Sequence, residues 1–158
     1  MEKMLPIRPR VSTQRSAMQF AIVASQYNLD FTQSLVDAAY AEISALEPDA
    51  KVDLVWVPGT FELPLIAQTL AARNTYAAIT TFGVLLKGKT LHAELIARSV
   101  TDALLRISLT YGVPVIDGVV IGTAALAKER CCDEEKNRGI EAARAAVAMA
   151  RTMKTLAR

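Results

Sequence analysis

The stretch AAITTFGVLLKGKTLH, from Ala77 to His92, combines a short strand-forming run, a glycine-bounded turn and the start of a helix. A short apolar run that leads through a turn into a helix is typical of a buried strand in a parallel sheet. In such sheets, ligands bind beyond the carboxyl ends of the strands. This stretch therefore predicts both the class of fold and the position of a functional site.

The same alternation of strand and helix patterns extends over the rest of the chain. We expect strands at about 19–25, 51–57, 77–82 and 113–121, and helices at about 31–46, 62–74, 92–111 and 124–158. This alternation predicts an α/β fold with a parallel sheet and crossover helices. We expect a three-layer sandwich, in which a four-stranded parallel sheet in flavodoxin-like order has helices on both faces. Residues 19–158 are expected to form a single domain. Residues 1–18 contain two prolines and several basic residues, and are expected to form an extended arm.

The composition excludes several classes of protein. The 158 residues are 52% hydrophobic and 22% charged, with a net charge of +2, which is typical of a globular protein. The apolar stretches are far shorter than the roughly 20 residues of a membrane span, and the N-terminus lacks the apolar segment of a signal peptide. No basic stripe is interleaved with aromatic residues. We therefore expect a cytoplasmic protein that binds neither membranes nor nucleic acid.

The two cysteines, Cys131 and Cys132, are adjacent in sequence. Adjacent cysteines rarely form a disulfide because the bond strains the peptide between them. The acidic run 133–135 that follows does not stabilise a thiolate, and one histidine with two adjacent cysteines lacks the spacing of a metal site. We expect reduced thiols with no catalytic role, and no metal.

The segment GVLLKGKT, residues 83–90, matches the phosphate-loop pattern G-x-x-x-x-G-K-[ST], and the run ending at Asp117 resembles the aspartate that often holds magnesium in nucleotide hydrolases. Phosphate loops usually have small residues at the variable positions, whereas residues 84–86 are bulky and apolar and resemble a strand and pocket wall. We therefore favour an anion site at the following helix N-terminus. A nucleotide hydrolase stays an alternative.

Other candidate residues lie where strands are expected to end. His92, the only histidine, can both donate and accept protons near neutral pH, although a surface histidine is the alternative interpretation. Tyr27 and Asn28 follow the first strand, and Phe61 and Glu62 follow the second. Two aromatic rings at adjacent strand ends can enclose a flat ring, but Phe61 and Glu62 also fit an ordinary helix start.

Five segments occur together in the order and spacing of the 6,7-dimethyl-8-ribityllumazine synthase family: VASQYN, VPGTFELP, GVLLKGKTLH, GVPVIDGVV and RCCDEEKNRGIEAA. The chain resembles this family from Gln19 to the C-terminus, and the family's usual VIRGxTxH segment accounts for the phosphate-loop pattern. The resemblance implies condensation of 5-amino-6-ribitylamino-uracil with 3,4-dihydroxy-2-butanone 4-phosphate, with release of phosphate and water and without a metal or organic cofactor. It also implies a homo-oligomer of pentamers, with active sites shared between adjacent subunits.

The same resemblance implies roles for individual residues. His92 matches the proton-transfer histidine. The expected substrate-binding residues are Tyr27, Asn28, Thr60, Phe61, Glu62, Val84, Leu85, Leu86 and Asp117. Lys89 and Thr90 match the turn that holds the substrate phosphate, and Arg130 resembles the arginine that reaches the phosphate from a neighbouring subunit.

The chain departs from the family pattern at several positions. Asp117 stands where the family commonly has an apolar residue, Glu134 where a lysine often supports the phosphate, and Ala93 where an aromatic residue is usual. The segment 121–128 is one residue shorter than usual. These departures leave open a catalytically weak flavin- or lumazine-binding or shell-forming paralogue. The sequence also leaves the assembly open between a pentamer, a decamer and an icosahedral 60-mer.

Overall fold

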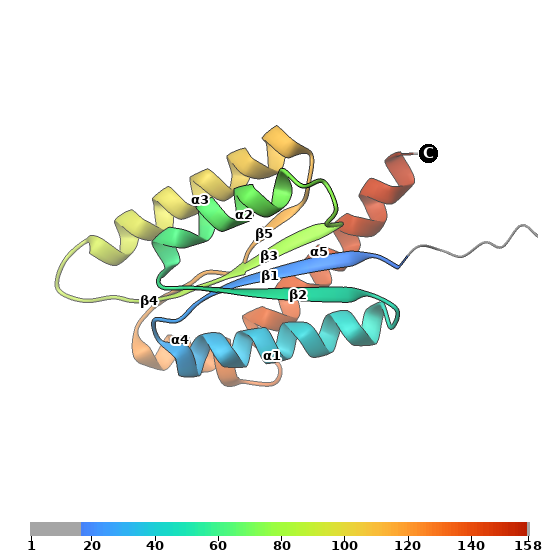
Figure 1. The fold of residues 1–158 in the computed structure, drawn as a ribbon. Helices are drawn as coiled ribbons and strands as arrows, with labels where there is room; N and C mark the ends of the chain where they lie inside the picture. The colour runs from blue at the N-terminus through green and yellow to red at the C-terminus, as the bar shows by residue number, and fades with distance from the viewer. Residues whose placement is uncertain (1–16, 158) are drawn as a thin grey trace, which may run out of the picture.

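The computed structural model of the chain describes residues 17–157 (Figure 1). Its strands are β1 (Gln19–Ser25), β2 (Lys51–Val57), β3 (Ala78–Phe82), β4 (Val84–Leu86), β5 (Val115–Asp117) and β6 (Val120–Gly122). Its helices are α1 (Leu29–Leu46), the 3-10 helix η1 (Thr60–Glu62), α2 (Leu63–Ala71), α3 (His92–Tyr111), α4 (Ala124–Cys132) and α5 (Arg138–Leu156). The expected arm, residues 1–18, lies outside the described residues except for its last two positions.

The main sheet has four parallel strands in the order β2-β1-β3-β5. The chain passes from β1 outward to β2 and then crosses back to β3 on the other side of β1. This reversal is the switch point at which flavodoxin-like sheets bind ligands. The predicted fold class and strand order are confirmed, and the switch point directs attention to the carboxyl ends of β1 and β3.

Helices cover both faces of this sheet (Figure 1), with α2 and α3 on one face and α1, α4 and α5 on the other. The central strand β1 is buried on both faces. Phe20 and Ile22 pack toward α1 and α5, whereas Ala21 and Val23 pack toward α2 and α3. A strand buried on both faces has a nearly continuous apolar sequence, which is why QFAIVAS predicted it with the observed bounds.

The fourth predicted strand, residues 113–121, is wrong as a single element. The chain leaves the main sheet after β5, and β6 instead pairs with β4 in a separate two-stranded parallel sheet. The break falls at Gly118, where an added Cβ would lie 2.5 Å from the ring of Phe82 and 2.6 Å from the carbonyl oxygen of Thr81. Such close backbone approach requires glycine. Because β6 pairs with β4, residues 84–86 form a strand within the segment 83–92 that was expected to be a turn.

The predicted C-terminal helix, residues 124–158, is also wrong as one element, because residues 133–137 separate α4 from α5. Asn137 organises this break. Its Oδ1 accepts a hydrogen bond from the N–H of Gly139 at 2.7 Å, and its Nδ2 donates to the carbonyl oxygen of Cys131 at 2.6 Å. One side chain thus caps the start of α5 and satisfies the end of α4.

The predicted second helix, 62–74, is shorter in the structure and is preceded by η1. The predicted end at residue 74 is wrong, because α2 stops at Ala71. Asn74 adopts a left-handed conformation with φ 52°, which does not continue a right-handed helix. None of the helices within residues 17–157 combines the length and apolar character that a membrane span requires.

Candidate active site

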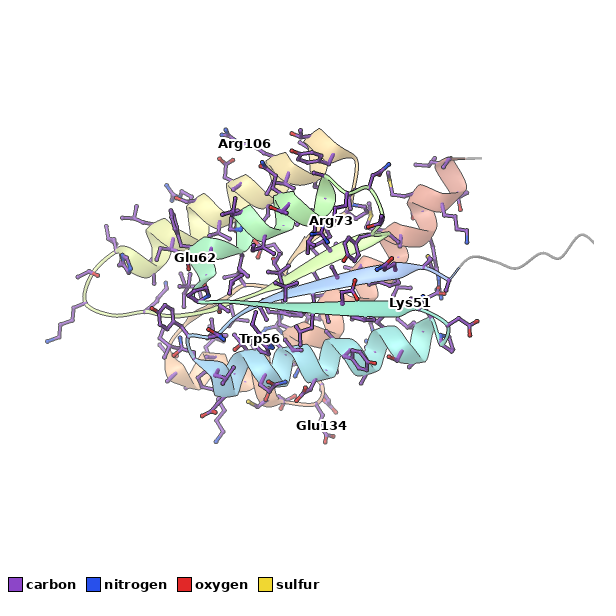
Figure 2. All side chains as sticks on the ribbon, in the orientation of Figure 1. Lys51, Trp56, Glu62, Arg73, Arg106 and Glu134 are labelled. Carbon is purple, nitrogen blue, oxygen red and sulfur yellow. The ribbon has the colours of Figure 1, made fainter. Side chains whose placement is uncertain are left out.

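A cleft of about 860 Å³ opens at the carboxyl ends of the strands, where the switch point lies. Figure 2 shows Glu62 at this end of β2 and Lys51 at the opposite end of the same strand. The cleft is formed by the β1–α1 turn, η1, strand β4 and the first turns of α3. The predicted site residues that line it are Tyr27, Asn28, Thr60, Phe61, Glu62, Val84, Leu85, Leu86, Thr90 and His92.

The β1–α1 turn forms the first wall of the cleft. Asn28 adopts a left-handed conformation with φ 58°, and its Nδ2 donates to the carbonyl oxygen of Val84 at 2.8 Å. The N–H of Tyr27 donates to the carbonyl oxygen of Pro58 at 3.1 Å. These two bonds tie the turn to β4 on one side and to the end of β2 on the other. The ring of Tyr27 remains 69% exposed at the cleft.

The segment after β2 forms the second wall. Glu62 Oε2 accepts a hydrogen bond from the N–H of Gly59 at 2.9 Å, which closes the turn before α2. Thr60 is buried and packs against Gly83 at the end of β3. Phe61, between them, is 65% exposed. The cleft thus carries two exposed aromatic rings, Tyr27 and Phe61, which suit contact with a flat heterocycle.

Strand β4 forms the third wall. Residues 84–86 pair with β6 as a regular parallel ladder, and they line the cleft. The interpretation of this segment as strand and pocket wall is confirmed. A segment whose backbone is engaged in a ladder is not a loop wrapped around phosphates.

The turn between β4 and α3 extends beyond the end of the sheet (Figure 1) and is exposed from Lys87 to His92. Within residues 17–157, the N–H groups of Gly88 to Leu91 donate no hydrogen bond. His92 is the first residue of α3, and its N–H donates only a long bond of 3.4 Å to Thr90 Oγ1. Free N–H groups at a helix start attract anions. Lys89 is exposed on this turn but does not line the cleft.

Arg130 does not line the cleft of its own chain. It lies on α4, and its Nη2 donates to Glu141 Oε2 at 2.7 Å, while Arg138 Nη1 donates to the same oxygen at 3.0 Å. Hydrogen bonds from Arg130 and then from Arg138 hold the pKa of Glu141 below its usual value. Two guanidinium groups share one carboxylate, so the cluster is positively charged. Arg138 and Glu141 were not predicted, although their three-residue spacing on one helix was a usable signal.

Two further positions lie apart from the cleft. Asp117 Oδ2 accepts from Thr101 Oγ1 at 2.6 Å, and its Oδ1 accepts from the N–H of Val119 at 3.0 Å. Its carboxylate is therefore engaged between β5 and α3, and its substrate-binding role stays a prediction. Figure 2 shows Glu134 on the side of the sheet covered by α1 and α4.

The cysteines do not contribute to the cleft either. Cys131 is buried, and burial raises the pKa of its thiol to about 12, whereas Cys132 is exposed. A thiol with so high a pKa is a poor nucleophile. Across the described part of the chain, no group of three or more histidine, cysteine, aspartate or glutamate side chains is arranged to hold a metal ion.

Comparison with known proteins gives consistent results. The family model described as 6,7-dimethyl-8-ribityllumazine synthase matches residues 17–154. A protein of that name from Stenotrophomonas maltophilia (strain R551-3) is 38% identical over 140 residues, covering 87% of this chain and 90% of the relative. Another of that name, from Coxiella burnetii (strain Dugway 5J108-111), is 35% identical over 143 residues, covering 89% and 95%.

A solved structure described as a phosphate-loop protein is 21% identical, with coverage of 88% and 94%, but its TM-score of 0.36 is too low to support any argument. The family model, by contrast, spans every element that builds the cleft, and the relatives align over almost their whole length. The chain therefore belongs to the 6,7-dimethyl-8-ribityllumazine synthase family.

Proposed function

We propose that this chain condenses 5-amino-6-ribitylamino-uracil with 3,4-dihydroxy-2-butanone 4-phosphate to give 6,7-dimethyl-8-ribityllumazine, phosphate and two molecules of water. One observation carries the proposal beyond family membership: a single cleft combines two exposed aromatic rings, a turn with free N–H groups and the only histidine. These features suit a heterocycle, a phosphate and a reaction with several proton transfers.

In this proposal the pyrimidine lies against Tyr27 and Phe61, beside the wall formed by β4. Glu62 accepts the N–H of Gly59 through Oε2, and its other carboxylate oxygen, Oε1, accepts from the ribityl hydroxyls. The phosphate lies at residues 88–91, the phosphate turn. There the Lys89 ammonium, the Thr90 hydroxyl and N–H groups that donate no hydrogen bond within residues 17–157 are available.

His92 moves protons in the proposed reaction. Attack of the pyrimidine amine on the ketone forms an imine and releases water, elimination then releases phosphate, and ring closure releases a second water. Each step needs a proton moved near neutral pH, for which imidazole is suited. His92 adjoins the phosphate turn, so it can serve both the leaving group and the new ring. Holding two reactive partners together supplies a further part of the acceleration.

We further propose that Arg130 acts at the cleft of a neighbouring subunit, within at least a pentamer. Its positive cluster with Arg138 and Glu141 lies outside its own cleft, so a second copy is needed to bring the cluster to the phosphate. Large apolar side chains on the α2/α3 layer support association with a second copy, because monomers rarely expose so many. Those at least 59% exposed are Phe61, Leu65, Leu91, Leu95, Leu105 and Leu109.

The activity is tested by mixing the purified protein with both substrates and following the lumazine chromophore against a protein-free reaction. The expected result is condensation well above the uncatalysed rate, and a rate equal to that background overturns the proposal. Tight lumazine binding without synthesis identifies the weak paralogue instead. Sedimentation of the same sample reports the assembly size. A cytoplasmic location stays a prediction from the sequence.

A further inference from the structure

One ion pair joins the two ends of the phosphate turn. Lys87 Nζ lies 3.4 Å from Glu94 Oε1, with the two side chains 50% and 39% exposed. Lys87 directly follows β4, and Glu94 is the third residue of α3, so the pair encloses residues 88–93. In the described part of the chain, no other hydrogen bond or ion pair joins the residues on the two sides of this turn.

Little else fixes the conformation of the turn. A Cβ added at Gly88 would find no heavy atom of the described residues within 4 Å. Leu91, which precedes α3, provides no side-chain hydrogen bond to cap the helix. The turn is exposed along its length. Free N–H groups bind an anion well only when they are held in converging directions, because ordering them during binding costs entropy. The turn therefore needs a restraint at its base.

A glutamate at position 94 lowers the stability of the fold unless it provides such a restraint. Within residues 17–157, its Oε2 is buried and has no hydrogen-bond partner, which opposes folding. Its carboxylate also lies two residues after His92, where its negative charge repels a phosphate bound at the turn. The Lys87 ammonium offsets that charge.

We infer that Lys87 and Glu94 are positioning residues that hold the turn 88–91 in its phosphate-binding conformation, while Lys89 contacts the phosphate itself. This inference rests on the proposed function and deepens it. The pair acts through the directions of the turn's N–H groups. It does not act by contact with the substrate.

The direction in which two substitutions change the phosphate affinity distinguishes a positioning role from a purely electrostatic one. If the pair only adds charge near the phosphate, Lys87→Met weakens phosphate binding and Glu94→Gln strengthens it. If the pair positions the turn, both substitutions weaken binding, by roughly two- to fivefold as expected for a half-exposed pair. The double variant then binds phosphate no more weakly than the single variant with the lower phosphate affinity. Lys87→Arg, which keeps the pair, retains the wild-type affinity.

The assay is titration of the intact protein with inorganic phosphate, followed by ³¹P NMR, together with the Michaelis constants of both substrates. Glu42→Gln is the matched control, because it removes a carboxylate from an ion pair with Arg144 between α1 and α5. We expect weaker phosphate binding and a raised Michaelis constant for the phosphate substrate only, with unchanged melting temperatures.

Opposite signs for the two single variants, additive losses in the double variant, or an equal loss in Glu42→Gln overturn the inference. Failure of the wild-type protein to bind inorganic phosphate also overturns it. Because this titration needs no turnover, a protein that binds phosphate as described but makes no lumazine contradicts the proposed function alone.

Discussion

Substitution of Gly83 by alanine tests how the cleft is built. Gly83 joins β3 to β4, and a Cβ added there would lie 2.8 Å from Thr60 Cγ2 and still closer to Thr60 Oγ1. Because Thr60 is only 4% exposed, it cannot turn away freely, and η1 must move. Overpacking of this kind costs about 1–3 kcal/mol. For a domain of this size, that corresponds to a melting temperature lower by roughly 2–12 °C.

The same displacement reaches the cleft, because Thr60 is continuous in η1 with Phe61 and Glu62. A shift of about 1 Å in a positioning segment can lower the rate by about a hundredfold. We therefore expect Gly83→Ala to lower kcat/KM through a raised Michaelis constant for the pyrimidine. Thermal unfolding at fixed protein concentration and steady-state kinetics measure the two effects.

Two further variants make this prediction specific. Gly88→Ala is the control for stability, because a Cβ there meets nothing within 4 Å, and it should melt as the wild-type protein does. Adding Thr60→Ala to Gly83→Ala removes the two closest atoms and should recover much of the lost stability. The reasoning is refuted if Gly83→Ala leaves both the melting temperature and the Michaelis constant unchanged, or if the second substitution recovers nothing.

Three other predictions concern single side chains. His92→Ala should lower kcat by about 10²–10⁴ with an unchanged melting temperature, because the side chain is exposed; a wild-type rate contradicts its role. At pH 8 a thiol reagent should label Cys132 and spare Cys131 in the folded protein, as intact-mass spectrometry can determine, and equally fast labelling of both contradicts the burial of Cys131. Because the pKa of Glu141 is lowered in the folded protein, folding favours the ionised carboxylate. Its stabilising effect is fully present at a pH above 4.5, the ordinary pKa of glutamate, and is lost as the pH falls through the folded-state pKa. The melting temperatures of the wild-type protein and Glu141→Gln should therefore converge on acidification, and a constant difference rules this out.

The main sheet was predictable because its strands carry their own signals. β1 and β2 were predicted with the observed bounds, since each is a short run of strand-forming residues that ends in a turn sequence. The end of α3 followed from Gly112, whose left-handed conformation with φ 65° ends the helix. These features are local, so a single sequence contains them.

The β4–β6 pair was not predictable, because its cause is not local. Strands of three residues are too short to show a period, and their pairing joins segments that lie far apart in the sequence. The run from Val113 to Ile121 contains Asp117 and Gly118, a dipeptide typical of a turn, but this local signal does not show that the residues after it pair with β4. The break at Gly118 depends on the ring of Phe82, which only the folded structure brings close.

The residues that line the cleft were easier to predict than the ion pairs around it. Parallel strands bring their carboxyl ends to one edge of the sheet, so residues after β1 and β2 and along β4 were expected to meet. The Lys87–Glu94 pair escaped prediction because its members belong to different elements and face each other only across a turn. The three-residue spacing of Arg138 and Glu141 on α5 was a usable signal, but their link to Arg130 was not predictable because Arg130 lies on another helix.

The separation of Arg130 from the cleft leads to a test of the shared site. If a site takes His92 from one subunit and Arg130 from the next, then His92→Ala and Arg130→Ala each damage every site in a pure oligomer. In oligomers assembled at random from equal amounts of both, a site is intact when an Arg130→Ala subunit meets a His92→Ala neighbour in the correct order. That occurs in about one quarter of sites, the product of two one-half chances, since cyclic interfaces are heterologous.

Refolding the two variants together should therefore restore about a quarter of the wild-type rate, measured at a concentration of phosphate substrate well below its Michaelis constant. The control is the same mixture without refolding, which keeps the parent oligomers separate. If mass spectrometry confirms mixed oligomers and the rate stays at the average of the parents, the two residues do not complete one another's sites across a subunit boundary. The positive cluster around Glu141 would then have to act within its own subunit, where it does not reach the cleft that the described residues form.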